Sequence, residues 1–355
     1  MIWLLTAIGA CIALAPNPDP DPDVLGLPPP PTPRPPGEPP ASGPRPADSL
    51  PLLLGTYAPE YLGSTDAMRD ELQRWDKSVP QRLSLAGFFF GLDSSNPAYN
   101  IPNIAGHLVR GGYTPLMNLS ANDTLEELVR GDRDDDVAAI AAATAQWAAE
   151  YPDAVMFVGP LQEMNGAWED YYGEPEDYKA FYARVQEIYA DNGVPDDAIQ
   201  WLFAPNGWSE DGDEFERYYP GHDRIDAVGV SSYLWGDCRG HDWTPPGEVF
   251  PEYLDRLAAM APGKSILLTQ TAVSSERADG SADVDGKDDQ LRAAYELLAA
   301  RGDITGVMYF NIDKECDWAV WRDGEVTQGY RDGVSAPGIG YVDPAALAEA
   351  LRPWR

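Results

Sequence analysis

The sequence predicts an α/β protein built as a (β/α)8 TIM barrel, preceded by a disordered proline-rich linker. Two observations carry the barrel prediction: after residue 50, short apolar segments alternate with amphipathic helical segments, and there are eight apolar segments. Eight strands that alternate with helices over about 300 residues match the length and element order of such a barrel. A doubly wound open sheet is the alternative, but the first strand is followed by "GTYAPEY" and not by a Gly-rich phosphate loop.

The predicted elements follow one another in a regular order. The strands are expected at residues 51–57, 82–92, 113–120, 154–162, 199–206, 225–233, 265–273 and 304–312. Helices, with apolar residues three or four positions apart, are expected at residues 136–151, 176–193, 249–260, 288–301 and 344–354. In a barrel of this kind the chemistry collects at the carboxyl ends of the strands, so the residues that end each strand are the ones to inspect.

The first fifteen residues, "MIWLLTAIGACIALA", are apolar but too short to span a bilayer, which takes about 20 helical residues. We expect residues 1–15 to be an export signal. Its "IGAC" resembles the bacterial lipobox, in which the chain is cut before a cysteine, here Cys11, that then carries lipid. Cleavage after Ala15 and a disordered apolar end are the alternatives. The expected location is the cell surface or the periplasm, with the lipid on Cys11 as the only membrane attachment, and otherwise secretion.

Proline dominates residues 16–50, in runs such as "PNPDPDPD" and "PPPPTPRPPGEPP". A segment of this composition forms neither helix nor sheet and behaves as a stiff spacer, here reaching roughly 100 Å at ~3.1 Å per residue. We therefore expect three parts: the signal region, this linker, and a barrel domain at residues 51–355 that the linker holds away from a surface.

Charge and cysteine content narrow the class of partner. The formal net charge of −33 excludes nucleic acid as a partner, because phosphates would be repelled. If Cys11 carries lipid, Cys238 and Cys316 remain as an even pair in an oxidising compartment, and we expect a disulfide between them. Two buried free thiols are the alternative. We expect a monomer.

No motif in the sequence implies a cofactor or a metal. The three histidines, His107, His222 and His241, lack metal-ligand spacing and lie on different predicted segments. The segment "DGSADVDGKDD", residues 279–289, has part of the acid spacing of a calcium loop but no bidentate Glu at the twelfth position, so a solvated loop is expected there.

Amides, one carboxylate and aromatic side chains stand where the predicted strands end. The strand ends present Glu163, Asn206, Tyr233, Gln270 and Asn311, and the loops just after them contain Trp168, Trp208, Trp235 and Trp318. Indole and phenol rings stack on the apolar face of a pyranose, while amides and carboxylates bind its hydroxyl groups. Any single Trp could serve packing alone, but their shared placement predicts a sugar-binding site.

The same residues carry a resemblance to glycoside hydrolase family 26, which is best known for endo-β-1,4-mannanases. "EMNGAW" is similar to the fourth-strand motif of that family, and "APN" to its fifth-strand segment. "YYPGHDRIDAVGVSSYLW" resembles the sixth-strand stretch, and "VMYFNIDKECDW" the eighth strand with its following Trp. Together these motifs span most of residues 51–330, in the family's order and spacing.

The resemblance implies a role for each residue of the predicted site. It implies that Glu163 is the general acid/base, that Tyr233 and Asn206 line the bond-cleaving subsite, and that Trp168 and Trp318 are sugar platforms. The other expected substrate contacts are Gln162, Asn165, Trp235 and Asn311.

Two positions depart from the family pattern. Retaining glycosidases need a second carboxylate roughly 5–5.5 Å from the first, and the family places it on the seventh strand, where this chain has Gln270. A neutral amide is a poor nucleophile and does not stabilise oxocarbenium charge as an anion does. The family residue before the acid/base is His, and here it is Gln162. We therefore expect impaired hydrolysis.

The sequence leaves alternatives for the second catalytic group, for the function and for the polysaccharide. Asp93, or one of Asp313, Glu315 and Asp317, could act as the base of an inverting reaction, which needs a carboxylate ~6.5–9.5 Å away; ordering of loops is the simpler role for them. The protein is then either a tethered hydrolase that uses an unusual second group or a catalytically lapsed barrel that binds polysaccharide. β-Mannan is the expected polysaccharide, with mixed-linkage β-glucan and β-1,3-xylan as the alternatives.

Overall fold

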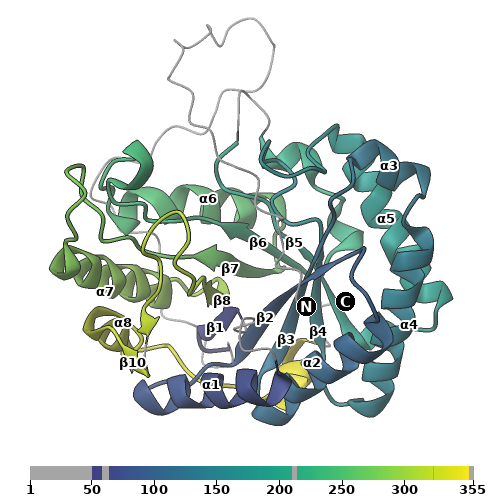
Figure 1. The fold of residues 1–355 in the computed structure, drawn as a ribbon, viewed down its shortest axis with the longest axis horizontal. Coiled ribbons are helices and arrows are strands. Elements are labelled where there is room, and N and C mark those ends of the chain that lie inside the picture. Colours follow the sequence, from purple (N-terminus) through teal and green to yellow (C-terminus); the bar gives the residue numbers. More distant parts are fainter. Residues whose placement is uncertain (1–49, 58–63, 210–213, 323, 352–355) are drawn as a thin grey trace, which may run out of the picture.

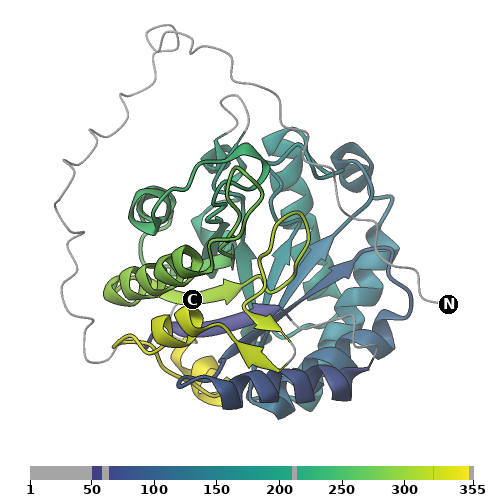
Figure 2. The same cartoon turned by 60° about the vertical axis from the view of Figure 1, so that its left-hand side comes forward.

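The computed structural model is a closed barrel of eight parallel strands surrounded by helices (Figures 1 and 2). It describes residues 50–57, 64–209, 214–322 and 324–351. The expected signal region, residues 1–15, its Cys11 and nearly all of the linker, residues 16–50, lie outside these ranges. Within them, no helix combines the length and the apolar character that crossing a membrane requires.

Every barrel strand lies inside its predicted range. The strands are β1 (Leu53–Tyr57), β2 (Leu85–Gly91), β3 (Thr114–Ser120), β4 (Met156–Pro160), β5 (Ile199–Phe203), β6 (Ala227–Ser231), β7 (Ser265–Thr271) and β8 (Ile304–Tyr309). Each strand pairs in parallel with the next in the sequence, and β8 pairs with β1 to close the barrel. The barrel prediction is confirmed, and the open-sheet alternative is excluded.

Helices cover the outside of the barrel (Figure 1). They are α1 (Thr65–Ser78), α2 (Pro97–Gly111), α3 (Leu125–Arg130), α4 (Asp134–Glu150), α5 (Pro175–Asp191), α6 (Pro246–Met260), α7 (Val284–Ala300), α8 (Gln328–Gly333) and α9 (Pro344–Leu351). Short 3-10 turns lie at Asp196–Ala198, Phe215–Tyr218, His222–Arg224 and Cys238–Gly240, and β9 (Trp321–Arg322) pairs with β10 (Glu325–Val326). The five predicted helices are present as α4, α5, α6, α7 and α9; α1, α2, α3 and α8 are additions to the prediction.

Helix starts differ from the prediction for a local reason. α5 and α6 begin earlier than expected, at Pro175 and Pro246, because proline fits the first helical position, where its missing N–H needs no partner. α7 begins at Val284 because the Asp283 carboxylate caps it by accepting from Gly286 N at 2.8 Å. Residues 284–289 are thus helical, which corrects the expectation of a loop through residue 289.

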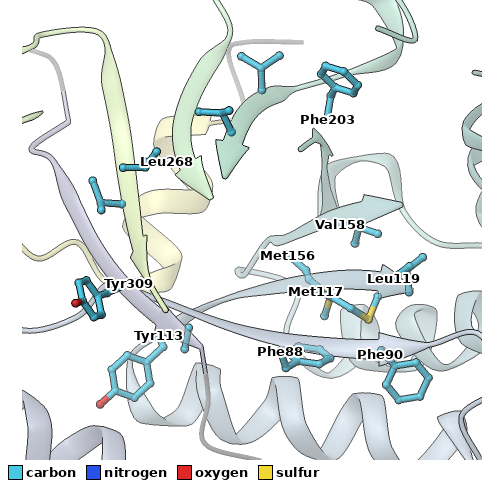
Figure 3. Close-up of a cluster of buried hydrophobic side chains, with 14 of the residues drawn as sticks. Phe88, Phe90, Tyr113, Met117, Leu119, Met156, Val158, Phe203, Leu268 and Tyr309 are labelled. Atoms are coloured by element: carbon cyan, nitrogen blue, oxygen red, sulfur yellow. The ribbon is translucent and has the colours of Figure 1, made fainter. Parts of the chain in front are cut away.

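Two apolar layers hold the fold. The outer layer lies between the strands and the helices and includes Phe88, Met117, Val158, Phe203 and Leu268 (Figure 3). The inner layer fills the barrel, with alternate residues of each strand pointing inward. α9 contributes Leu347, Ala348 and Leu351 to this inner layer and closes the amino end of the barrel. The carboxyl end carries the predicted site residues.

Candidate functional site

Inward-facing glycines make room for large polar side chains at the carboxyl end of the barrel interior. Tyr57 of β1 and Asn118 of β3 are buried there. A Cβ atom on Gly87 would lie 2.7 Å from the Tyr57 ring, and one on Gly159 would lie 3.0 Å from Asn118 Oδ1. A Cβ atom would overlap the ring at Gly87 and press on the amide at Gly159, so the two glycines leave space for the phenol and the amide.

Glu163 lies just after β4 in a strained backbone conformation. Its φ is +54°, and that of Leu161 is +52°, in the left-handed region that costs an L-residue roughly 1–2 kcal/mol. Strain of this kind is retained mostly where it places a functional side chain. Glu163 N donates to Ala204 O at 2.8 Å, and Trp168 Nε1 donates to the carboxylate oxygen Oε2 at 3.1 Å. The loop thus fixes the carboxylate next to an indole.

The environment of Glu163 favours its protonated form. Burial raises the pKa of this carboxyl above its usual range, and the polar side chains of Ser231, Trp168 and Asn206 only partly oppose the shift. A carboxyl group that retains its proton closer to neutral pH is suited to protonate a leaving group. The geometry is therefore compatible with the predicted general-acid role.

Gln270 is brought against Glu163, as the strand order predicts. The strand pairings on both sides of β7 shift register around this residue, and its side chain is buried. Gln270 Nε2 donates to Gln162 Oε1 at 2.6 Å and to Glu163 Oε1 at 3.4 Å, while Gln270 Oε1 accepts from the Tyr233 hydroxyl at 3.0 Å. The group that faces Glu163 from β7 is thus an amide with three polar partners.

A chain of buried hydrogen bonds continues from this amide into the barrel. Gln162 Oε1 also accepts from Asn118 Nδ2 at 2.9 Å, and Asn118 Nδ2 donates to the Tyr57 hydroxyl at 2.9 Å. The Tyr57 hydroxyl donates to Thr269 O at 2.9 Å. We call Tyr57, Asn118, Gln162 and Gln270 the amide relay. The first two members were not predicted as site residues; a polar residue inside an otherwise apolar strand, as in "PLMNLS", is the signal for Asn118.

Asn165 is fully buried, and its amide groups bond to protein atoms. Its Nδ2 donates to Asn206 O at 2.9 Å and to Ser209 Oγ at 2.8 Å, and its Oδ1 accepts from Asn206 N at 2.9 Å. The expectation that Asn165 contacts substrate is therefore corrected, because this amide joins the loops after β4 and β5. Asn206, the residue it holds, is half-buried, and its side chain favours the charged form of Glu163.

Two indoles extend from Glu163 toward solvent. Trp168 and Trp208 stack with ring centroids 5.9 Å apart and an interplanar angle of 21°. Trp168 donates to Glu163, while Trp208 is 55% exposed. An exposed indole beside the acid is the arrangement that a sugar-stacking surface requires. The sequence places Trp208 after a strand end, but the family motifs assign it no role.

Trp318 does not have the exposed surface that a sugar platform needs. Its exposed fraction is 0%, and its ring packs against Tyr233 and Trp235 at centroid distances of 5.3 and 5.0 Å. The platform prediction for Trp318 is therefore corrected: the indole supports Tyr233 from behind. Trp235 is half-buried and stacks on His241 at 4.3 Å, which covers one of its faces.

The Asn311 side chain hydrogen-bonds to the backbone of the loop after β8. Its Oδ1 accepts from Val320 N and from Trp321 N, both at 2.8 Å, and its Nδ2 donates to Trp321 O at 3.1 Å. These three bonds close the loop after β8. Asn311 thus orders this loop, and its contact with substrate stays a prediction.

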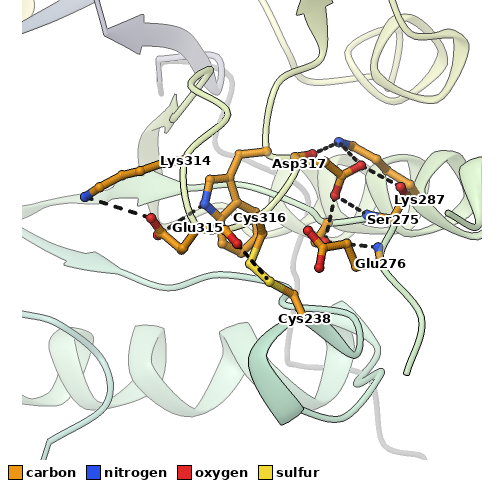
Figure 4. The surroundings of a disulfide bond; sticks show 10 residues. Cys238, Ser275, Glu276, Lys287, Lys314, Glu315, Cys316 and Asp317 are labelled. Atoms are coloured by element: carbon orange, nitrogen blue, oxygen red, sulfur yellow. Dashed lines mark hydrogen bonds and ion pairs between the residues drawn. A yellow bond between two sulfur atoms is a disulfide. The ribbon is translucent and has the colours of Figure 1, made fainter. Parts of the chain in front are cut away.

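The alternative bases are tied into loops. Asp93 is bonded by Asn122, and Asp313 by Ala319 and Arg322. Glu315 contacts Trp318 and Lys314, and Asp317 contacts Ser274, Ser275 and Lys287 (Figure 4). The surroundings of Asp317 are the most complete, since its two oxygens accept three hydrogen bonds and Lys287 Nζ lies 3.6 Å away. These contacts favour the loop-ordering role.

Glu169 is a carboxyl group near the site that the sequence did not single out. It lies one residue after Trp168, and Glu169 N donates to Gly166 O at 3.1 Å. Burial, and then the nearby Glu163 carboxylate, raise the pKa of Glu169 to about 7. A carboxyl that titrates near neutral pH beside the acid is the first candidate for a substitute base. Because Glu169 follows the motif in a loop, only the fold reveals that it couples to Glu163.

Cys238 and Cys316 form a disulfide, as predicted, with Cα atoms 6.2 Å apart (Figure 4). The bond joins the loop after β6 to the loop after β8. Tyr233 and Trp235 precede one cysteine and Trp318 follows the other, so this bond constrains the aromatic side of the site.

One group of possible metal ligands is found in the described part of the chain: Cys238, Cys316 and Glu276. The disulfide uses the sulfur atoms of both cysteines. In the segment with partial calcium-loop spacing, Asp279 accepts from Ser281 N, and Asp283 caps α7. These acids serve a turn and a helix start.

The middle of the chain is similar in sequence to a known protein family. The model of glycosyl hydrolase family 26 matches residues 110–250, a range that contains Glu163, Asn206 and Tyr233 but ends before Gln270. Among curated proteins, none has significant sequence similarity to this chain.

Solved structures share the fold at low sequence identity. A modular endo-β-1,4-mannanase from Cellulomonas fimi has 14% identity and a TM-score of 0.56, covering 83% of this chain and 74% of its own. A family 26 β-mannanase from Bacteroides ovatus has 12% identity and a TM-score of 0.56, with coverages of 83% and 92%. The family 53 catalytic domain from Ignisphaera aggregans has 14% identity and a TM-score of 0.54, with coverages of 82% and 98%. The barrel is thus similar to glycoside hydrolases of two families, and its central part, residues 110–250, matches glycosyl hydrolase family 26.

Proposed function

We propose that this chain is a surface-tethered member of glycoside hydrolase family 26 that binds β-mannan-type polysaccharide and hydrolyses it poorly. In this proposal Glu163 is the general acid/base, and Gln270 occupies the nucleophile position. The contact between Gln270 Nε2 and Glu163 Oε1, 3.4 Å, carries the proposal, because it identifies the group that faces the acid from β7.

The chemistry that remains is half of a retaining mechanism. Glu163, with its raised pKa, can protonate a glycosidic oxygen. The second half needs an anion that attacks the anomeric carbon or stabilises its positive charge, and the Gln270 amide supplies neither. Binding does not depend on that step, since Asn206, Tyr233, Trp168 and Trp208 remain as polar contacts and stacking surfaces.

The substrate class rests on the comparisons. The matched family model and the printed descriptions of the Cellulomonas fimi and Bacteroides ovatus proteins, both mannanases, support a β-mannan. Mixed-linkage β-glucan and β-1,3-xylan are the competing ligands to be tested alongside it.

The test measures binding and hydrolysis in the same samples. The purified protein is incubated with mannan, mixed-linkage glucan and β-1,3-xylan, and both retained protein and new reducing ends are scored. We expect retention on mannan with few or no new reducing ends. Rapid hydrolysis would contradict the proposal and would direct attention to Glu169 as the substitute base; absence of binding to all three would contradict the assignment of the site.

The tether rests on Cys11 and the linker at residues 16–50, and its test is separate. In a Gram-negative host we expect the full chain to partition with membranes, and Cys11→Ser to release it. A wholly soluble protein with an unmodified Cys11 would contradict the tether without affecting the sugar site.

A further inference from the structure

The amide relay has a fixed direction of hydrogen bonding, because it begins at a backbone carbonyl. Thr269 O can only accept, so the single proton of the Tyr57 hydroxyl points toward it. Tyr57 therefore accepts from Asn118, and the other Nδ2 proton of Asn118 points to Gln162 Oε1. Gln162 Oε1 must then accept on its other side as well, and it does so from Gln270 Nε2 at 2.6 Å.

The other orientations of these amides leave buried groups without partners. Within the described part of the chain, Asn118 Oδ1 has no hydrogen-bond partner and lies against Gly159, so turning this amide would bring an N–H to a place without an acceptor. The turn would also set the Asn118 oxygen against the Tyr57 oxygen. Tyr57 could then donate its proton to the Asn118 oxygen only by losing its hydrogen bond to Thr269 O. The orientation seen is thus the one that satisfies the backbone carbonyl.

We propose that Gln162 is a positioning residue that requires a hydrogen-bond donor at position 270, so the two departures from the family pattern are one linked change. The inference rests on the proposed function, because it concerns the same site. It has a direct consequence: Gln270→Glu alone does not restore a working nucleophile, whereas Gln270→Glu combined with Gln162→His does.

The reason is the number of donors and acceptors at each position. An ionised carboxylate at position 270 would set an acceptor 2.6 Å from Gln162 Oε1, which is already an acceptor. The introduced carboxyl group would avoid this clash by keeping its proton, and a neutral acid is a weak nucleophile. A neutral imidazole at position 162 accepts at one ring nitrogen and donates at the other. It can accept from Asn118 and donate to a carboxylate at position 270.

Other charged and titratable groups lie around position 270. Glu163, from the end of β4, and Tyr233, from the loop after β6, contact Gln270, and Tyr57 of β1 bonds to the carbonyl of Thr269. Lys314 and Glu315, in the loop after β8, act electrostatically on Glu163 and on Tyr233, respectively. Glu163 opposes ionisation of any carboxyl introduced nearby, whether at position 162 or at position 270. A comparison of these two positions therefore cancels its effect to first order.

The first test uses that matched pair and needs no substrate. Gln162→Glu places a carboxylate where two amide N–H groups converge, which lowers its folded-state pKa, so its unfolding midpoint relative to native should rise with pH up to about 4.5 and stay level above it. Gln270→Glu places the same group against an acceptor, which raises its folded-state pKa, so its relative midpoint should fall as pH rises above about 4.5, or the variant should fail to fold near neutral pH. Equal pH slopes for the two variants, or failure of Gln162→Glu as well, would overturn the fixed direction of the relay.

The second test is a cycle of Gln162→His, Gln270→Glu and the double variant. Each single change should lower the unfolding midpoint, and the double variant should be more stable than the sum of the two losses by about 2 °C or more. On mannan at pH 6, the double variant should release reducing ends at least tenfold faster than Gln270→Glu, whose activity should rise toward alkaline pH. Additive losses, or identical pH profiles for Gln270→Glu and the double variant, would overturn the linkage.

The two tests separate the inference from the proposed function. If no variant binds or cleaves a polysaccharide, the proposed function fails, while the different pH slopes of the two variants still decide the direction of the relay. If the native protein binds mannan but the pH slopes agree, the proposed function stands and the linkage fails.

Discussion

The two ends of the barrel interior are built from different materials. The amino end is mainly apolar and is closed by α9, with a core that includes Leu53, Leu85, Val155, Phe157, Leu267 and Leu347; the buried polar residues Thr114 and Gln200 are exceptions. The carboxyl end holds the amide relay, in which buried polar groups bond to one another and Asn118 Oδ1 has no partner among the described residues. Burial of an apolar side chain stabilises the fold, whereas burial of an amide costs free energy unless its N–H and C=O groups are hydrogen-bonded.

The amino end of the barrel interior mainly stabilises the fold, whereas the carboxyl end carries the candidate site. The carboxyl end also contains the left-handed residues Leu161 and Glu163 and a carboxyl whose pKa is raised by burial, each of which opposes folding. Features that oppose folding are retained in proteins mostly at positions where they contribute to function. Changes at the amino end should therefore alter stability, and changes at the carboxyl end should alter ligand binding or pH dependence.

The largest effect is expected from the amino end. Phe157→Ala removes a fully buried ring from the barrel interior and should lower the free energy of unfolding by about 3–5 kcal/mol. Denaturant titration measures that loss, and the polysaccharide affinity of the folded fraction should remain that of the native protein. An affinity loss in the folded fraction would show that the two ends are coupled, and the comparison would break.

The disulfide should rank next and should affect both stability and binding. Cys238 and Cys316 are 78 residues apart, and the entropy of closing a loop of that length amounts to ~4 kcal/mol. Cys238→Ser with Cys316→Ser should lower stability by up to this amount and weaken mannan binding, because the bond holds the loops that carry Tyr233 and Trp318. Reduction of the native protein should reproduce both losses. Unchanged affinity after reduction would show that packing alone holds these loops.

Trp208→Ala should produce the opposite pattern from Phe157→Ala. The indole is 55% exposed, so its removal should change stability by no more than about 0.5 kcal/mol. If it is a stacking surface, affinity for mannan should fall about tenfold, or ~1–2 kcal/mol. Tyr99→Ala is the matched control, since Tyr99 is 62% exposed on α2. Equal effects of the two substitutions on affinity would argue against a platform at Trp208.

The fold was predictable because its signal is repeated. Each of the eight strands is a short apolar run followed by a helical pattern or a turn, so an error in one segment changes little. α1 is the informative miss: "TDAMRDELQRWDKS" buries only Met68, Leu72 and Trp75, and its apolar stripe is too sparse to stand out. The helix is fixed by its Ser64 cap and by packing against the barrel.

The site was predictable only in part, because motifs give order along the chain but not exposure. Glu163 and Gln270 come together as the strand order requires. Trp318 and Asn311 match the family motif, yet the first is buried and the second bonds to its own loop. Only three-dimensional packing determines which face of a loop residue reaches solvent. The direction of the amide relay likewise depends on Thr269 O, a backbone atom that carries no sequence signal.

The smallest expected effect, and the one that tests the raised pKa of Glu163, comes from Glu163→Gln. Burial raises the folded-state pKa of this carboxyl above its ordinary value of 4.5, so the folded protein keeps a proton that the unfolded chain releases as pH rises. The contribution of Glu163 to stability therefore falls as pH rises from about 4.5 through the folded-state pKa. Glu163→Gln preserves the shape and cannot ionise, so its stability relative to native should be close to zero at pH 3.5 and positive at pH 7.

Thermal unfolding across this range measures the difference, and Glu169→Gln provides a second curve. Its carboxyl has a pKa raised to about 7, by burial and then by Glu163, so the same sign is expected with its rise between about pH 4.5 and 7. If Glu163→Gln is less stable than native at pH 7, the polar side chains of Ser231, Trp168 and Asn206 outweigh the effect of burial. Glu163 would then be an ordinary ionised carboxylate, and the carboxyl end of the barrel would store less strain than the comparison requires.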